Sequence, residues 1–539
     1  MAPPVPLSFS RQIGALSSIV LNSMIRKCLR DSNLKEALQL FDRNPASRDV
    51  VSWNLVMDGL IENHRLNQAQ RLFDEMPHRD VASWNTILSG YHRARDQSRV
   101  YLLLRKMGRF GFFPNEYTIS IVITAFLGSK FSSLVPQIHA RVFHLGLGSS
   151  VFVASALMKG YANIRESTGL QRLFNELLMK DVSSWNTLIS GCMEIGCIED
   201  AERAFRTMPA KNSISWTSLL NGYIINGRID KAQLVFETIQ ESERNVYLWT
   251  VMISGYVKDK KYEEALMFFI SMVNSGAMPN HFTYSCTLSA CALTSSLLLG
   301  QQVHVRVVKY GMPNSVVLLT SLVDMYAKCG DIVSASRVFQ KMQNKNSVSW
   351  NSIIGGLARH GLGTRALEMF EQMIEEGTKP DQVSFVNVLY ACGHVGLVRE
   401  GEAYFKSMKV KYGIEAELKH YACMVDLYGK AGELDKAERL IKEMPIEPDV
   451  VVWGAFIGAS AMHSTRKLSE FAVQGIERLK KDHPAVYSMF LKIHAEEGSW
   501  SEVTELKRML GRKHVEKQKA GWTSYQKELS PAKKQYPMT

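Results

Sequence analysis

His494 and Glu496 come nearest to a catalytic motif in this sequence. A His-x-Glu pair followed by Pro-Cys-x-x-Cys holds the zinc ion and the proton-shuttling Glu of cytidine deaminases. No cysteine follows Cys423, and the eight cysteines include no Cys-x-x-Cys pair, so we interpret the His-x-Glu pair as a chance match. No phosphate-binding Gly-x-x-x-x-Gly-Lys motif is present, and no Ser/His/Asp or paired-carboxylate arrangement stands out. We therefore expect a protein that is not an enzyme and that has no metal site and no cofactor.

Polar residues that recur at a regular spacing indicate binding chemistry instead. Ser-Trp-Asn or Ser-Trp-Thr appears at residues 52–54, 83–85, 184–186, 215–217 and 349–351. Adjacent copies are 31 residues apart, a period that indicates a solenoid of repeats, each burying its apolar face against its neighbours. The third residue changes between Asn and Thr while the Trp stays, and both side chains can donate and accept hydrogen bonds.

The elements that position these residues are expected to be pairs of short amphipathic helices. The segments begin at residues 18, 50, 81, 116, 151, 182, 213, 246, 281, 316, 347, 382 and 418. We expect the Ser before each Trp to cap the first helix and the Trp to pack against the preceding helix. Small residues, such as Gly90 on a first helix and Ala201 on a second, would let helix axes approach closely. Many second helices should end before Met-Pro, as at Met76.

Length, composition and charge limit the classes of protein to which this sequence can belong. At 539 residues the chain is too long for one ordinary core, and no apolar stretch reaches the roughly 18 residues of a membrane span. The cysteines, such as Cys291 and Cys329, are expected to be reduced core residues. Of the net charge of +12, residues 507–539 carry +7 and residues 1–30 carry +4, which leaves about +1 for the repeats. Nucleic-acid binding by the repeats would therefore depend on local basic stripes and on contacts to bases.

The repeats resemble those of pentatricopeptide repeat proteins, specifically the plant subfamily that mixes long and short repeats (the PLS subfamily). The similarity is close in Asn-Thr-Ile-Leu-Ser-Gly-Tyr at residues 85–91 and in the helix pattern of residues 261–272. A tetratricopeptide repeat has Gly four residues after its Trp, whereas Gly90 lies six residues after Trp84. The resemblance implies an all-α fold, a right-handed superhelical solenoid of antiparallel helix-turn-helix repeats.

The C-terminal part narrows the resemblance to the E-type members of that subfamily, which lack a DYW deaminase domain. Residues 420–429 are similar to the last short repeat, and residues 450–455 and 484–526 to the E-type extension. The resemblance implies about 13 repeats over residues 18–449, an extension over residues 450–526 and a basic tail, expected to be disordered, over residues 527–539. The first 17 residues are a candidate transit segment, since acids are absent before Asp31 and Ser residues accompany Arg11.

Proteins of this kind act as site-recognition factors for cytidine-to-uridine editing of organelle transcripts. The resemblance therefore implies single-stranded organelle RNA as the ligand, and a DYW-type deaminase and other editing proteins as partners through residues 450–526. The deaminase would be supplied in trans. We expect a mitochondrial location, with the chloroplast as the alternative, and no membrane partner. Two other functions stay open: RNA stabilisation, processing or translation, and a protein-binding scaffold of tetratricopeptide type.

In the resembled family, the fifth and last residues of each repeat read one base between them, consistent with the one-base-per-repeat pattern of helical RNA readers. Transferred to this sequence, the pairs are Asn22 with Asp49, Asn54 with Asp80, Asn85 with Asn115, Ser155 with Asp181, Asn186 with Asn212, Thr217 with Asn245, Thr250 with Asn280, Thr320 with Asn346, and Asn351 with Asp381.

By the same resemblance these pairs predict the target U-U-Y-n-G-Y-A-A-n-A-U-n-n, where n marks repeats without an assigned base. Those repeats carry Ser120 with Ser150, Ser285 with Ser315, Val386 with Glu417, and Ala422 with Asp449. An alternative is that the reader residues only cap helices or form turns. The residue three before each reader, such as Val51 or Ile214, is mostly apolar and would either wedge between bases or be partly buried against the previous repeat.

Overall fold

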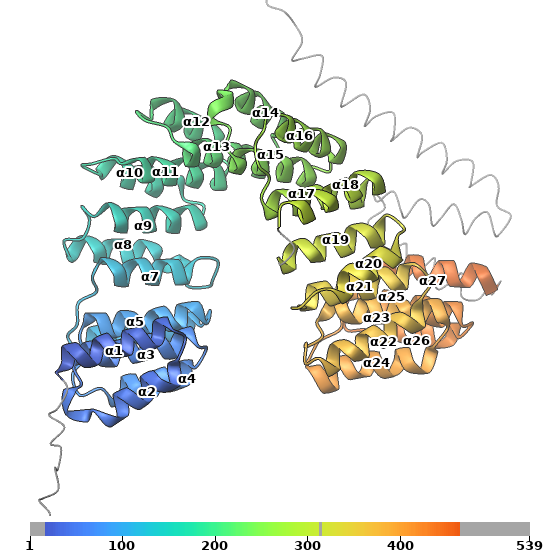
Figure 1. The fold of residues 1–539 in the computed structure, drawn as a ribbon, viewed down its shortest axis with the longest axis horizontal. Helices are drawn as coiled ribbons and strands as arrows, with labels where there is room; N and C mark the ends of the chain where they lie inside the picture. Colours follow the sequence, from blue (N-terminus) through green and yellow to red (C-terminus); the bar gives the residue numbers. More distant parts are fainter. Residues whose placement is uncertain (1–16, 312–314, 464–539) are drawn as a thin grey trace, which may run out of the picture. The chain divides into compact units, whose positions relative to one another are not determined.

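The computed structural model describes residues 17–311 and 315–463, and these residues form helices and connecting turns without any β-strand (Figure 1). The predicted all-α array of helix-turn-helix repeats is confirmed. The chain divides into two compact units after Lys260.

The first unit contains eight first helices, which carry the predicted polar positions, and seven second helices. Its first helices are α1 Ser18–Arg30, α3 Val50–Glu62, α5 Val81–Arg93, α7 Glu116–Phe126, α9 Val151–Asn163, α11 Val182–Ile195, α13 Ser213–Ile225 and α15 Val246–Lys258. Its second helices are α2 Leu34–Arg43, α4 Leu66–Glu75, α6 Gln97–Arg109, α8 Val135–His144, α10 Ser167–Glu176, α12 Ile198–Thr207 and α14 Ile229–Thr238. Short 3-10 turns lie at Pro45–Ser47, Ser132–Leu134 and Glu241–Glu243.

The second unit repeats the same alternation in its described residues. Its first helices are α17 His281–Leu293, α19 Val316–Lys328, α21 Ser347–Arg359, α23 Gln382–Val395, α25 Leu418–Lys430 and α27 Val450–His463. Its second helices are α16 Tyr262–Asn274, α18 Leu297–Lys309, α20 Ile332–Gln340, α22 Gly363–Glu375, α24 Val398–Tyr412 and α26 Leu434–Glu443.

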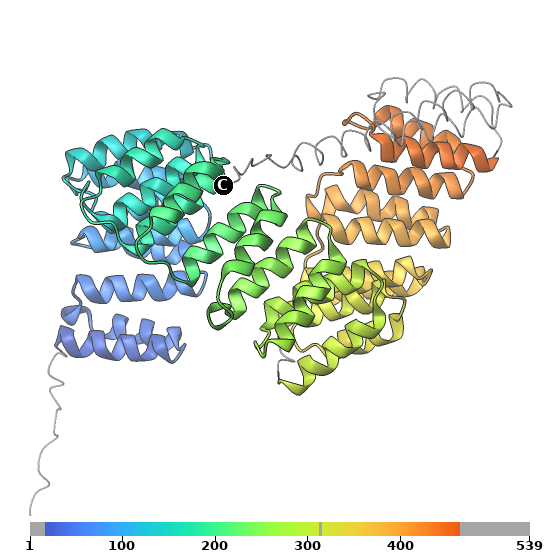
Figure 2. The ribbon, with the colours of Figure 1, turned by 90° about the horizontal axis from the view of Figure 1, so that it is seen from above.

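Each of the 13 predicted segments begins at the first residue of a helix. Within each unit, every first helix packs against the next first helix, and each second helix lies against the first helices on either side of it (Figure 1, Figure 2). The first helices therefore form one continuous layer in each unit and the second helices form the other. The apolar core lies between the two layers and is continuous from repeat to repeat.

The first helices begin with a different residue from the one predicted. The Ser before each Trp was expected at the N-cap, but the N-cap of α3 is Asp49, and Ser52 is the third helical residue. The N–H of Ser52 donates to Asp49 Oδ1 over 2.8 Å, and the N–H of Asp49 donates to Ser52 Oγ over 2.7 Å. This reciprocal capping box satisfies two backbone donors that the helix start would otherwise leave unpaired. The last residue of one repeat thus starts the first helix of the next.

The tryptophans pack between neighbouring repeats, as predicted. Trp350 is fully buried, and its ring meets the ring of Phe339 edge-on at 4.8 Å between centroids. The same contact recurs in Phe41–Trp53, Phe73–Trp84, Phe174–Trp185, Phe205–Trp216 and Phe236–Trp249, at 4.6–5.0 Å. Each such edge-to-face pair adds to the free energy of burying the rings.

A basic residue covers each of these six phenylalanines. The Arg79 guanidinium lies 5.1 Å from the centre of the Phe73 ring, and Arg79 Nε donates to the Phe73 carbonyl oxygen over 2.9 Å. Arg48, Lys180, Lys211, Arg244 and Lys345 occupy the same place over the other five rings. These six cations contribute to repeat packing through cation–π attraction.

Small residues lie where the helices cross, as predicted. A Cβ added to Gly90 would come within 2.8 Å of Ile61 Cδ1, and one added to Gly255 within 2.5 Å of Ile224 Cδ1. Ala201 is fully buried, and α4 ends at Glu75 with Met76 in an extended conformation before Pro77. None of the eight cysteines, all of which lie in the described residues, forms a disulfide, and burial raises the pKa of the Cys291 thiol to about 12, so the thiol stays protonated. The expectation of reduced core cysteines is confirmed for Cys291, whereas Cys329 is only partly buried.

Several sequence predictions concern residues outside the described part of the chain. They are the transit segment up to residue 16, the extension from residue 464 onward, the tail over residues 527–539, and the pair His494 and Glu496.

We expect Trp350→Ala to lower the free energy of unfolding by about 3–5 kcal/mol, because it leaves a cavity beside Phe339 at a repeat junction. Leu234→Ala is the control, since Leu234 is 65% exposed and its truncation should change stability by less than about 0.5 kcal/mol. Urea titration followed by circular dichroism measures both. Equal unfolding curves for the two variants would contradict the role of this contact.

Candidate functional site

The nine predicted last-position residues share one local geometry, because each is the N-cap of the following first helix. Each accepts a hydrogen bond from backbone N–H in the first turn through its side-chain oxygen; they are Asp49, Asp80, Asn115, Asp181, Asn212, Asn245, Asn280, Asn346 and Asp381. These nine residues therefore cap helices, and a cap of this kind leaves one terminal atom of each side chain outside the capping hydrogen bond. The backbone N–H donates to the atom Oδ1 in every case, so the second terminal atom is Oδ2 in Asp and Nδ2 in Asn.

Three predicted pairs are joined directly by hydrogen bonds across 27 to 30 residues of chain. Asn22 Nδ2 donates to Asp49 Oδ1 over 3.1 Å, Asn85 Nδ2 to Asn115 Oδ1 over 3.1 Å, and Asn351 Nδ2 to Asp381 Oδ1 over 2.9 Å. These contacts arise because stacking of consecutive first helices puts the fifth residue of one helix beside the N-cap of the next. The two members of each of these pairs therefore face one point.

The charge of Asp381 is favoured by its surroundings. Partial burial opposes ionisation, but hydrogen bonds from the Ser384 N–H and from the Asn351 amide outweigh it, so the pKa of Asp381 lies below its ordinary value. Burial is likewise outweighed at Asp49 by the Ser52 N–H and the Asn22 amide, and the pKa of that carboxyl is also lowered. Both groups are carboxylates at neutral pH and can only accept hydrogen bonds there.

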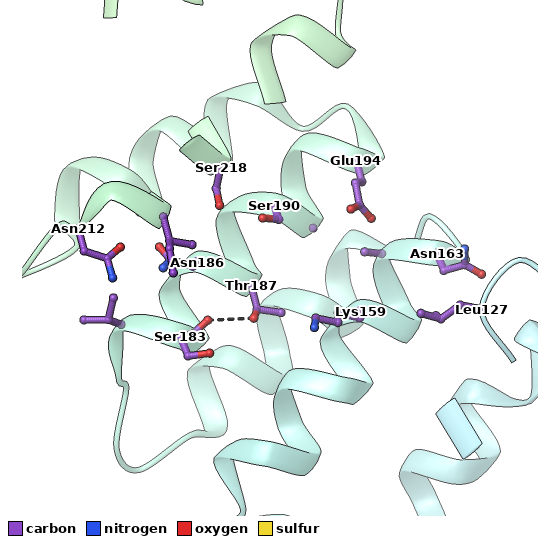
Figure 3. Close-up of a pocket in the computed structure, with 14 residues that line it drawn as sticks. Leu127, Lys159, Asn163, Ser183, Asn186, Thr187, Ser190, Glu194, Asn212 and Ser218 are labelled. Atoms are coloured by element: carbon purple, nitrogen blue, oxygen red, sulfur yellow. Dashed lines mark hydrogen bonds between the residues drawn. The ribbon is translucent and has the colours of Figure 1, made fainter. Parts of the chain in front are cut away.

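Two further pairs line cavities in the first unit. Asn186 and Asn212 line a cavity of about 620 Å³ together with Ile214 (Figure 3). Thr217 and Asn245 line a neighbouring cavity of about 480 Å³, which also includes Ile214 and Tyr247. Each cavity thus combines two polar side chains with at least one apolar side chain from the second position of a first helix.

Three of the remaining predicted pairs are not joined by a hydrogen bond in the described structure. Asn54 with Asp80, Ser155 with Asp181, and Thr320 with Asn346 belong to this group. Thr250 lies in the first unit, where its hydroxyl donates to the Val246 carbonyl, and Asn280 lies in the second unit, where it caps α17.

Several fifth-position residues have a buried polar atom without a hydrogen-bond partner in the described structure. These atoms are Asn22 Oδ1, Asn54 Oδ1, Asn186 Oδ1, Ser285 Oγ and Thr320 Oγ1. Buried polar atoms are ordinarily paired, and an unpaired one needs an explanation such as a bound molecule. These five atoms share one repeat position, the fifth residue of a first helix.

The apolar residues three places before the readers are exposed. Val51, Ile214, Tyr247, Val317 and Val348 are between 43% and 65% exposed. These five side chains are partly covered and partly exposed, which agrees with both roles considered from the sequence, wedging between bases and partial burial against the previous repeat. Exposed apolar side chains beside unpaired polar atoms suit a ligand with flat apolar faces and polar edges.

Some residues of the site were not predicted. Ser190 and Glu194 line both cavities, and Ser218 does so as well. Ser190 and Glu194 follow Asn186 by four and eight residues, a spacing that places them on the same helix face, so helical periodicity could have identified them. Thr118 and Ser384 were missed too: their hydroxyls donate to Asn85 Oδ1 over 2.6 Å and to Asn351 Oδ1 over 2.7 Å.

In the described residues, no cluster of three or more His, Cys, Asp or Glu side chains is placed to bind a metal ion. None of the helices there has the length and apolar character that crossing a membrane requires.

The chain matches two protein-family models. The model described as PPR repeat family matches residues 79–128, 244–292 and 345–394. The single-repeat model described as PPR repeat matches residues 19–43, 51–81, 183–213, 214–243, 317–347, 383–412 and 420–447. The chain belongs to the pentatricopeptide repeat family.

Similar proteins come from Arabidopsis thaliana and maize. One Arabidopsis pentatricopeptide repeat-containing protein is 31% identical, over 91% of this chain and 87% of its own length. A second, named mitochondrial, is 32% identical over 88% of this chain, and a third, named chloroplastic, is 31% identical over 92%. This chain spans 65% and 48% of the lengths of those two relatives. The crystal structure of the maize pentatricopeptide repeat protein PPR10 is similar in fold, with a TM-score of 0.55 at 20% identity over 93% of this chain and 80% of that one.

We expect the stability of the protein to depend on pH through Asp381. Because the folded-state pKa is lowered, the stabilisation is fully present above the ordinary Asp pKa of about 3.9 and is lost as pH falls through the folded-state value. Asp381→Asn keeps the capping oxygen but does not titrate. Thermal unfolding between pH 6 and pH 3 should therefore show a larger loss of Tm for the unmodified protein than for the variant, and parallel losses would contradict this.

Proposed function

We propose that this protein binds single-stranded RNA in a sequence-specific way and acts as a site-recognition factor for cytidine-to-uridine editing of organelle transcripts. The observation that carries the proposal is the convergence of the fifth and last residues at one point in three of the nine pairs, with the last residue oriented by its own capping hydrogen bond. Helical RNA readers of this kind use two or three side chains per base. The nine pairs named from the sequence are the proposed base contacts.

The capping hydrogen bond provides a physical reason why Asp and Asn at the last position of a repeat would select different bases. Since Oδ1 is engaged by the N–H of the first turn, Asp381 offers Oδ2 to a ligand and Asn212 offers Nδ2. A carboxylate oxygen accepts from the ring N–H of uracil or guanine, whereas an amide N–H donates to the unprotonated ring nitrogen of cytosine or adenine. Asp at this position therefore favours keto bases, and Asn favours amino bases.

The fifth residue is proposed to determine whether a purine or a pyrimidine fits beside the repeat. Thr217 is smaller than Asn186, and its hydroxyl donates to the carbonyl of Ser213 in its own helix, away from the last residue. A short side chain leaves room for a purine, whereas an Asn that reaches the last residue, as Asn85 does, leaves room for a pyrimidine. The two residues together yield the proposed target U-U-Y-n-G-Y-A-A-n-A-U-n-n.

The proposed editing role and the proposed binding of a deaminase rest on the resemblance of the C-terminal part of the chain to E-type members of the PLS subfamily. The described start of the 450–526 extension is α27, which packs on α25 and α26 and has Gly454 at the fifth position. Glycine has no side chain with which to read a base, so the extension is proposed to bind proteins, a DYW-type deaminase among them. We propose a mitochondrial location, with the chloroplast as the alternative.

We expect Asp181→Asn to change the base preferred at the fifth target position from G to A, because the group offered to the base becomes a donor. Asn212→Asp should change the preference at the sixth position from either pyrimidine to U. Each switch should amount to about tenfold in relative affinity, the size expected for one mispaired hydrogen bond. Fluorescence anisotropy with four RNAs that differ at the tested position measures it.

Asp96→Asn is the matched control. Asp96 caps the second helix α6 by accepting from the Arg99 N–H over 2.9 Å, the same chemistry outside the reading positions. This variant should leave base preference unchanged. A protein that binds no RNA, or variants that keep the original preferences, would contradict the reading mechanism.

The editing role has its own test. Loss of the protein in the plant should abolish editing at a cytidine a few nucleotides downstream of the target pattern, measured by sequencing organelle transcripts. If editing is intact while the abundance or processing of a transcript with the pattern changes, the protein is an RNA stabilisation or processing factor instead.

A further inference from the structure

One repeat junction of the second unit lacks the aromatic contact found at six others. At those six junctions, the Phe at the eighth position of a second helix meets the Trp at the fourth position of the next first helix. The equivalent residues of α18 and α19 are His304 and Leu319. Two smaller side chains replace two large rings there, and Leu319 is only partly buried. This junction therefore leaves space that the aromatic pair fills elsewhere.

A cavity of about 540 Å³ lies at this junction, lined by residues of α18, α19 and α20 and of the turn that follows α20. Each of the three helices contributes an apolar side chain to it: Val308, Leu319 and Val338. The volume is in the range of small-molecule binding sites. None of the nine proposed base-contact pairs lines this cavity, so it is separate from the proposed base contacts.

The polar lining of the cavity includes a hydrogen-bonded pair. His304 Nδ1 and the Tyr326 hydroxyl are 2.9 Å apart. Burial raises the pKa of Tyr326, and burial together with the Lys341 charge lowers the pKa of His304, so both side chains are neutral at pH 7. The hydroxyl has no other hydrogen-bond partner in the described residues, so it donates to Nδ1, and the imidazole proton is on Nε2. His304 thus keeps one N–H donor for a ligand.

Two cations line the same cavity without an acid to neutralise them. Arg337 and Lys341 are four residues apart, on α20 and at its C-cap, and neither forms an ion pair in the described residues. Like charges at this spacing destabilise a helix. Neither α18 nor α20 contains Asp or Glu. Asp331, the N-cap of α20, accepts from the Ser334 N–H over 2.9 Å and does not line the cavity.

The first unit has the same arrangement with its charges balanced. His139 Nδ1 and the Tyr161 hydroxyl are also 2.9 Å apart. At the sixth and tenth positions of α10, the residues equivalent to the two cations are Arg172 and Glu176, whose side chains form an ion pair over 2.8 Å. The second unit thus has a cation where the matching repeat has a neutralising carboxylate. This difference favours an anionic ligand at the junction of α18, α19 and α20.

We propose that this cavity binds a small phosphate monoester with an apolar or aromatic body, the chemistry of a nucleoside monophosphate. A phosphate offers three acceptor oxygens, enough for both cations and for the side-chain amides of Gln343 and Asn344, which also line the cavity. A carboxylate offers only two. The apolar side chains contact the body of the ligand, and the His304 N–H donates to it. This site is independent of the proposed RNA recognition.

Isothermal titration calorimetry of the full-length protein with adenosine, guanosine, cytidine and uridine 5′-monophosphate tests the site. At least one mononucleotide should bind, and the matching nucleoside and inorganic phosphate should each bind at least about tenfold more weakly. Lys341→Glu reproduces the charge pattern of the first unit and should weaken binding roughly 10- to 100-fold, the size expected for a hydrogen bond between charged groups. Leu319→Trp introduces the ring found at the six other junctions and should abolish binding without lowering Tm.

Lys406→Glu is the matched control, because it makes the same change of charge at an exposed lysine on the second helix α24 of the same unit. Its affinity for the mononucleotide should be unchanged, and circular dichroism verifies that all three variants keep their helices. The site is wrong if no mononucleotide binds at about 1 mM, or if either cavity variant keeps the original affinity. Displacement of the mononucleotide by the target RNA would also overturn it, since the cavity would then hold an RNA phosphate. The titration contains no RNA, so its failure is distinct from a failure of the proposed function.

Discussion

The hydrogen bond from a first-turn backbone N–H to the last residue of the preceding repeat is the interaction on which the other features depend. It fixes where nine of the first helices begin, at the nine predicted last-position residues. When first helices begin at the same point of each repeat, equivalent residues face the same side of the layer. The second and fifth residues of these repeats therefore lie on one face. The bond also directs one terminal atom of an Asn or Asp inward, toward the helix, and the other outward.

Over most of the repeat, the residues that pack the helices therefore differ from the residues proposed to contact RNA. Only the last residue of the repeat serves both purposes. The Trp–Phe contacts and the six basic side chains above the phenylalanine rings belong to packing, and acids balance bases in residues 31–506, whose net charge is only about +1, the remainder of +12 after +7 in residues 507–539 and +4 in residues 1–30. Recognition by such a surface must come mainly from base edges and faces. The unpaired buried atoms of Asn54 and Asn186, and the exposed Ile214, are features of that kind.

The fold could be predicted from the sequence because the 31-residue period and the Trp spacing are properties of a single repeat. Ser52 was misplaced by three residues because Ser at the N-cap and Ser at the third helical position both belong to the capping box, and only the partner Asp49 distinguishes them. The cavities could not be predicted, since helical periodicity places Ser190 and Glu194 on the same face as Asn186 but does not show that Asn212 and Ile214 of the next repeat lie beside them.

The double use of the last residue limits how such a protein can change its target during evolution. A residue that cannot cap would leave backbone donors unpaired at a repeat junction and weaken the stack at that point. Asp and Asn both cap, and their codons differ by a single nucleotide. One point mutation can therefore exchange the hydrogen-bonding character of a site such as Asp181 without loss of the helix start. New base specificities can thus arise through variants that remain folded. The need to cap the next helix also limits which residues can occupy this position.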